Sequence, residues 1–255
     1  MESEPMTDTT GDIEPELERV LPDAGADLLP ELRDALDTNH WYGDLSLRVH
    51  DALAGRRHDG AAAAAAGVEL LHAYCRVRGQ LLVQLSDDIA HSLTADPTRT
   101  LLATDHLYAA AYAAFAHANA PTTLFTTAID TSQRITTAFT ARYTDQAQSM
   151  TEPGDLVDGT TGALGEAAAV AGAVLADATG AQRDAARTLG RGLGALESVR
   201  RADESEPRDR PVTLPNVDET QLNEYADRRR ADVSRALDTL ESSVDVRALQ
   251  ELVPE

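Results

Sequence analysis

The chain has 255 residues and a formal net charge of −21 at pH 7, with 43 Asp and Glu set against 22 basic residues. No lysine is present, so every basic residue is arginine. This excess of negative charge opposes binding to nucleic acid and to anionic membrane surfaces, because both are polyanions. The single cysteine, Cys75, excludes an internal disulfide and a multi-cysteine metal site.

The same composition indicates the salt concentration of the protein's surroundings. Carboxylates keep a surface hydrated in concentrated salt, which also screens their mutual repulsion. We therefore expect a halophilic source, an archaeon; the alternative is an ordinary acidic protein from a GC-rich genome. No early apolar stretch resembles a signal peptide, and no apolar run is long enough to span a bilayer. A cytoplasmic protein without stable membrane insertion is the expectation.

Helical patterns fill the first half of the chain. Residues 1–12 are polar and acidic and are expected to form a disordered tail, followed by a single domain over residues 13–255. Residues 101–118 contain few polar side chains, which predicts a helix at the centre of the fold. Helices are predicted within 13–36 (two short ones), after the turn at 40–43, over 61–85, over 101–118, and over 121–150 with Leu124, Ile129, Ile135 and Phe139 pointing inward.

The second half continues the pattern. Gly180 is expected to cap a helix at its carboxyl end, and Gly190, Gly192 and Gly194 are expected to permit close helix packing. Residues 203–216 contain three prolines and are predicted to be a loop. No convincing strand pairs occur, so the fold class is all-α, one multi-helix bundle. The predicted helices are 162–178, 181–202, 219–242 and 245–253.

Five short segments resemble, in the same order, motifs of the trans-type isoprenyl diphosphate synthases, the polyprenyl synthetase family. Each is weak alone, and the alternative is that helices rich in alanine and leucine imitate one another. The segments are Val68 to Cys75, Leu102 to Asp105, Thr160 to Leu164, Leu193 to Arg200, and Arg210 to Pro215.

The resemblance implies the isoprenoid synthase fold and a reaction that joins an allylic diphosphate to isopentenyl diphosphate. In that family two aspartate-rich clusters hold Mg²⁺ on the leaving diphosphate, because departing negative charge needs nearby cations. The matching positions here carry no carboxylate, and Thr160 replaces the lysine of a Lys-Thr pair. The residues at the two cluster positions are Gly79, Gln80 and Val83, then Arg201, Ala202 and Ser205.

Neighbouring acids could replace the missing ligands only with local unwinding. Asp87 and Asp88 lie about eight residues late, and Asp203 and Glu204 are rotated away if their segment stays helical. The nearby arginines permit a different site, one that binds an anion without metal, and the alternative is surface ion pairing. The candidate vestigial pocket comprises Arg76, Arg78, Gly79, Gln80, Thr160, Thr161, Arg200 and Arg201.

These observations predict a catalytically inactive polyprenyl synthetase-like protein that acts as a regulatory or binding subunit. It would form a homodimer, or a heterodimer with an active prenyl synthase, and would need no cofactor. One alternative is an active prenyltransferase with a remodelled Mg²⁺-diphosphate site, which would need Mg²⁺. The other alternative is an all-α scaffold of unknown role.

Overall fold

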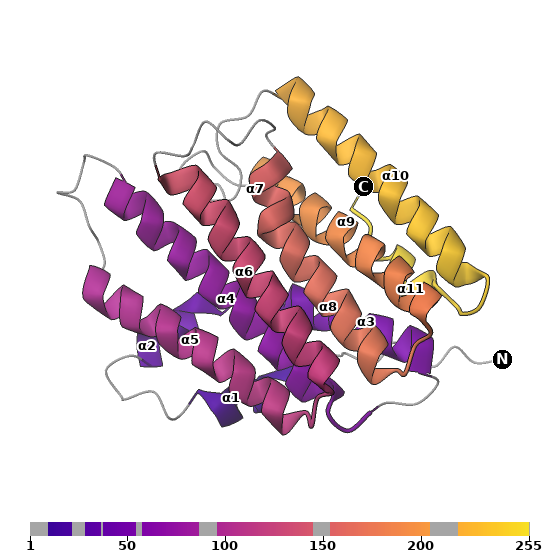
Figure 1. The fold of residues 1–255 in the computed structure, drawn as a ribbon, viewed down its shortest axis with the longest axis horizontal. Helices are drawn as coiled ribbons and strands as arrows, with labels where there is room; N and C mark the ends of the chain where they lie inside the picture. Colours follow the sequence, from indigo (N-terminus) through magenta and orange to yellow (C-terminus); the bar gives the residue numbers. More distant parts are fainter. Residues whose placement is uncertain are drawn as a thin grey trace.

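The computed structural model describes residues 10–21, 29–36, 38–54, 58–86, 96–144, 154–204 and 219–254. Every regular element in these ranges is a helix, which confirms the all-α prediction (Figure 1). None of the described helices has the length and apolarity needed to cross a bilayer. The helices are α1 (Thr10–Val20), α2 (Leu29–Ala35), α3 (Trp41–Ala54), α4 (Ala61–Ser86), α5 (Pro97–His117), α6 (Thr122–Tyr143), α7 (Gly154–Gly159), α8 (Thr161–Leu175), α9 (Gly180–Glu204), α10 (Glu219–Glu241) and α11 (Arg247–Gln250).

Helix α8 is the centre of the bundle. Every residue of α8 is buried except Glu166, which is partly exposed. The helix packs against α3, α4, α6 and α9. A helix that is apolar all round belongs in an interior, and its many alanines and glycines let the neighbouring backbones come close.

Glycines set the spacing between α9 and its neighbours. Gly190 and Gly194 lie against Gly165 of α8, with no room for a Cβ atom at any of the three. Gly192, on another face of α9, lies against Val233 of α10. The prediction that the alternating glycines permit close packing is therefore confirmed, and they serve two different neighbours.

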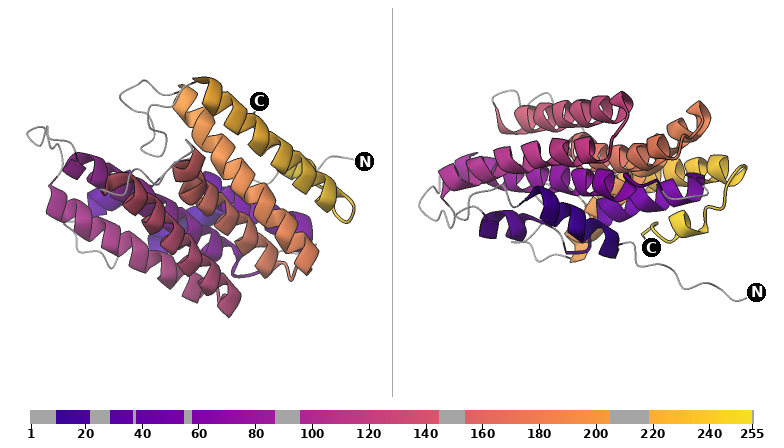
Figure 2. Two further views of the ribbon diagram at one scale, coloured as in Figure 1. Left: turned by 45° about the horizontal axis from the view of Figure 1, so that its top comes forward. Right: turned by 90° about the horizontal axis from the view of Figure 1, so that it is seen from below.

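Helices α5 and α6 lie further out than the sequence predicts. Leu101 and Leu102 of α5 are 40% and 51% exposed, and so α5 is an edge helix rather than the central one. Ile129 of α6 is 45% exposed, not inward. It follows Leu124 by five residues, which is about 140° around a helix, so the two cannot share a face. Helix α6 forms an outer layer over the bundle (Figure 2).

Several boundaries differ from the predicted ones. Helix α1 begins at Thr10, and α7 was not expected. Gly180 is not a C-cap, because it is the first residue of α9; the residue in the left-handed conformation after α8 is Asp177, with φ of 53°. Residues 203 and 204 belong to the last turn of α9. The acids Asp87 and Asp88, the end of the predicted helix at residues 145–150 and the remainder of the proline-rich segment, residues 205–216, lie outside the described residues.

Candidate functional site

Tyr42 occupies the space between α4 and α9, the two helices that carry the cluster positions. It lies in the first turn of α3 and is 2% exposed. Its ring centroid is 4.6 Å from that of His72 on α4 and 4.9 Å from that of Trp41. Burial raises the pKa of Tyr42 well above its usual value, although the nearby charge of Arg201 on α9 works in the opposite direction. Tyr42 is therefore a neutral side chain that fills the interior here.

Glu69 of α4 is a buried carboxylate that fastens α3 to α4. It is 1% exposed, and one of its oxygens accepts a hydrogen bond from the backbone N–H of Gly43 at 2.6 Å. Gly43 lies in the first turn of α3, where backbone N–H groups have no partner within the helix. Its other oxygen lies 3.8 Å from His72 Nδ1. The carboxylate thus caps a neighbouring helix and does not face a metal site.

Glu197 of α9 binds Arg201, which lies at the second cluster position, and its neighbour Arg200. It is 2% exposed, and it accepts hydrogen bonds from Nε and Nη2 of Arg200, each at 2.8 Å, and from Nε of Arg201 at 2.7 Å. Arg200 also binds Glu204 at 2.6 Å. The bond to Glu197 raises the pKa of the already strongly basic Arg200. Both arginines are therefore paired with carboxylates of their own helix.

The remaining candidate residues are spread over three places. Arg76 donates to the backbone oxygens of Asp34 and Ala35 at α2. Thr160 and Thr161 donate to backbone oxygens of α7, at 2.5 Å and 3.3 Å. Arg78 lines a cavity of about 650 Å³ between α4, α5 and α6, together with Tyr74 and Tyr108. Gly79 is buried and Gln80 is exposed on α4.

The donor set at the aligned cluster positions does not fit magnesium. Mg²⁺ requires hard oxygen ligands, usually carboxylates. Gly79, Val83, Arg201 and Ala202 offer none from their side chains, and Gln80 offers a single amide oxygen from an exposed side chain. Across the described part of the chain, no three His, Cys, Asp or Glu residues are grouped so that they could hold a metal ion. The chemistry that the family draws from Mg²⁺ therefore has no ligand set among these residues.

Cys75, next to this interior, is expected to be inert in the folded protein. It is 3% exposed, and burial raises the pKa of its thiol to about 12, so the reactive thiolate is scarce near neutral pH. We expect no reaction with a thiol-specific chromogenic reagent at pH 8 over an hour, and reaction of one thiol per chain in 6 M guanidinium, detected by absorbance. Rapid labelling of the native protein would contradict this packing.

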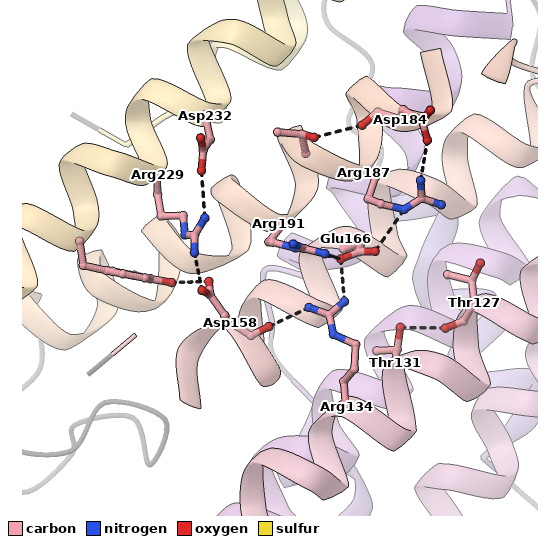
Figure 3. Close-up of polar contacts among 12 residues, drawn as sticks. Thr127, Thr131, Arg134, Asp158, Glu166, Asp184, Arg187, Arg191, Arg229 and Asp232 are labelled. Atoms are coloured by element: carbon pink, nitrogen blue, oxygen red, sulfur yellow. Dashed lines mark hydrogen bonds and ion pairs between the residues drawn. The ribbon is translucent and has the colours of Figure 1, made fainter. Parts of the chain in front are cut away.

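A second site lies on the outer side of the bundle, in a cavity of about 930 Å³ between α6, α7, α8 and α9. Three arginines converge there on Glu166, the one partly exposed residue of α8 (Figure 3). Arg134 of α6 and Arg191 of α9 each reach Oε2 at 2.6 Å, and Arg187 of α9 lies 3.2 Å from Oε1. The three guanidinium groups around Glu166 therefore carry more positive charge than its single negative charge can balance.

These contacts decide the charge state of Glu166. Burial works to raise its pKa, but the hydrogen bonds and charges of Arg191 and Arg134 outweigh burial and lower the pKa below its usual value. The carboxylate is charged at neutral pH. A lowered pKa means that its contribution to stability is present above the pKa of the unfolded chain and is lost as the pH falls through the folded-state pKa.

The polar network continues to α10. Asp158 of α7 accepts a hydrogen bond from Tyr225 at 2.7 Å and pairs with Arg229, which also binds Asp232 at 2.9 Å (Figure 3). None of these residues was a candidate from the sequence alone. The available signal was Glu166, a lone acid within the apolar run of residues 161–175, with Arg187 and Arg191 four residues apart on the helix that follows.

Comparison with solved structures defines the fold. The chain matches an isoprenoid synthase family member from Thermotoga neapolitana at a TM-score of 0.73, with 16% identity over 96% of this chain and 98% of the other. It matches a geranyltranstransferase from Methanosarcina mazei at 0.71, with 15% identity over 96% and 93%. It matches a geranyl diphosphate synthase small subunit from Antirrhinum majus at 0.59, with 16% identity over 96% and 95%.

This protein thus has the all-α isoprenoid synthase fold along nearly its whole length. No protein-family model and no curated protein matches its sequence.

Proposed function

We propose that the protein is a catalytically inactive relative of the trans-type isoprenyl diphosphate synthases that acts as a binding or regulatory subunit. The observation that carries this proposal is the replacement of the metal ligands within a retained fold. Where the reaction needs carboxylates on α4 and α9, the chain has Gly79 and Arg201. Without bound cations, a departing diphosphate has no compensating charge.

The packing of the interior supports the same proposal. Tyr42 fills the space between α4 and α9, and Glu197 neutralises Arg200 and Arg201. Arg200 also pairs with Glu204, so the two arginines meet two carboxylates and leave no excess positive charge to stand in for Mg²⁺. This arrangement disfavours the alternative, an active prenyltransferase with a remodelled metal site.

A direct assay separates the two functions. Purified protein is incubated with allylic and isopentenyl diphosphates, Mg²⁺ and concentrated KCl, and the products are measured by extraction of radiolabelled prenyl chains. We expect no product above a heat-killed control. Turnover that depends on Mg²⁺ would overturn the assignment as inactive.

A partner surface is the second part of the proposal. Leu101 and Leu102 at the start of α5 and Ile129 of α6 are large apolar residues left exposed, and α5 and α6 lie at the edge of the bundle. One structural neighbour is described as a small subunit. We propose that a second chain of this fold, either a copy or an active prenyl synthase from the same cell, covers this surface.

The partner proposal is tested by co-purification. Tagged protein expressed in its own host in high salt should retain a prenyl synthase or form a homodimer, as seen by mass spectrometry and light scattering. The double variant Leu101→Asp, Leu102→Asp should lose that association while remaining folded. A monomer in all conditions that changes neither the rate nor the product length of the host synthase would refute the regulatory role.

We also propose that the source is halophilic, because the 43 acidic residues greatly outnumber the 22 arginines. Lowering KCl removes the screening of their repulsion. We expect the helical circular dichroism signal to be lost as KCl is dialysed from molar to millimolar concentration. An undiminished signal in low salt would contradict this.

A further inference from the structure

We propose that the cavity between α6, α7, α8 and α9 is a metal-independent binding site for a small multiply charged anion carrying phosphate groups. Its floor consists of Arg134, Arg187 and Arg191 around the single carboxylate of Glu166 (Figure 3). The site lies apart from the interior between α4 and α9. It does not depend on whether the protein is an inactive synthase.

The arginines have hydrogen-bonding capacity to spare. Each guanidinium carries five N–H donors, and the contacts to Glu166, to the backbone oxygen of Asp158 and to Asp184 use only some of them. The side chains of Arg134, Arg187 and Arg191 are 33%, 44% and 40% exposed. Donors that are held in place by Glu166 and yet reach the cavity are suited to the fork-like recognition of phosphate oxygens.

Positive charge is concentrated around Glu166, even though Asp130 and Asp155 line the same cavity and the protein as a whole is acidic. Three guanidinium groups face Glu166. One of them, Arg187, also pairs with Asp184 at 2.7 Å, and Asp158 is engaged with Tyr225 and Arg229. The positive charge around Glu166 therefore exceeds its negative charge, in agreement with its lowered pKa. An anion that bridges Arg187 and Arg191 would balance the excess without displacing Glu166.

The rest of the lining limits what fits. Thr127, Thr131 and Thr137 of α6, the helix that also carries Arg134, line the cavity and offer hydroxyl groups, although Thr127 and Thr131 bind backbone oxygens in this structure. Asp130 and Asp155 also line the cavity. These two carboxylates repel an anion that extends across the cavity. The ligand must therefore stay beside the arginines, which suits a compact phosphate or diphosphate group and excludes nucleic acid.

The experiment is an isothermal titration of the full-length folded protein with inorganic phosphate and pyrophosphate, in KCl with EDTA present. We expect saturable binding of pyrophosphate without Mg²⁺. Arg187→Gln should weaken it at least about tenfold, since one charge-assisted bidentate contact is lost. The matched control is Arg230→Gln on α10: Arg187 and Arg230 are both 44% exposed, and each pairs with an aspartate three residues away.

A second variant tests the role of Glu166 in the opposite direction. Glu166→Gln keeps the side-chain shape and removes the competing negative charge, so pyrophosphate should bind more tightly, by about threefold or more. Equal weakening by Arg187→Gln and Arg230→Gln, or no binding by wild-type protein at millimolar pyrophosphate, would overturn the site. Circular dichroism establishes that each variant is folded. The titration does not measure prenyltransferase activity, so its result tests this site independently of the proposed function.

Discussion

Gly165→Ala is expected to destabilise the protein by about 2–3 kcal/mol. A Cβ atom at this position would lie 2.1 Å from the backbone oxygen of Gly190 and 2.9 Å from Cα of Gly194. Both contacts are with backbone, so no side chain can rotate away, and α8 and α9 must separate. Alanine is a better helix former than glycine by up to about 1 kcal/mol, which offsets only part of this cost. Denaturant unfolding followed by circular dichroism in high salt measures the loss.

The chain offers a matched control for this substitution in Gly180. It is the first residue of α9, and a Cβ atom there would have no neighbour within 4 Å. Gly180→Ala should change the free energy of unfolding by no more than about 0.5 kcal/mol. If Gly165→Ala changed the free energy of unfolding as little as Gly180→Ala, α8 and α9 would not be in close contact at Gly165. The central position of α8 would then also be contradicted.

The helices could be predicted from the sequence because their apolar spacing and their breakers are local signals. The stretch from Ala61 to Ser86 shows this: the Ala-rich run carries no break, and Leu70 and Leu71 are buried in α4 as expected. Position within the bundle was harder to predict. The segment over α5 looked central because it is poor in polar residues, but alanines are compatible with an exposed face, and it was the Gly- and Ala-rich α8 that became the core.

The candidate site shows the same limit. The absence of carboxylates at Gly79 and Arg201, which the resemblance aligns with the two clusters, can be read directly from the sequence, because it concerns the kind of residue at one position. The position of Tyr42 between α4 and α9 could not be predicted from the sequence, because it depends on the angles at which α3, α4 and α9 pack. The convergence of Arg134 with Arg191 on Glu166 joins residues far apart in the chain, and only the packing of α6 beside α8 brings them together.

The double variant Arg200→Gln, Arg201→Gln is expected to cost about 3 kcal/mol of unfolding free energy. Glu197 is 2% exposed, and its charge is balanced by these two arginines. Removing the partners leaves an uncompensated carboxylate in the interior beside Tyr42, which is far less favourable than losing an exposed ion pair. Arg230→Gln, which breaks an exposed pair with Asp227, should stay within about 0.5 kcal/mol of wild type.

Adding Glu197→Gln to the double variant distinguishes a charge effect from a packing effect. If the buried charge is the cause, the triple variant should recover most of the lost stability, because a neutral amide of the same shape replaces the carboxylate. Glu197→Gln alone should cost only about 1 kcal/mol, since Arg200 and Arg201 are 37% and 27% exposed and reach water. A triple variant no more stable than the double one would mean that the arginines support α9 by packing. Glu197 would then no longer explain why an arginine, Arg201, lies at a position where the resemblance implies a carboxylate.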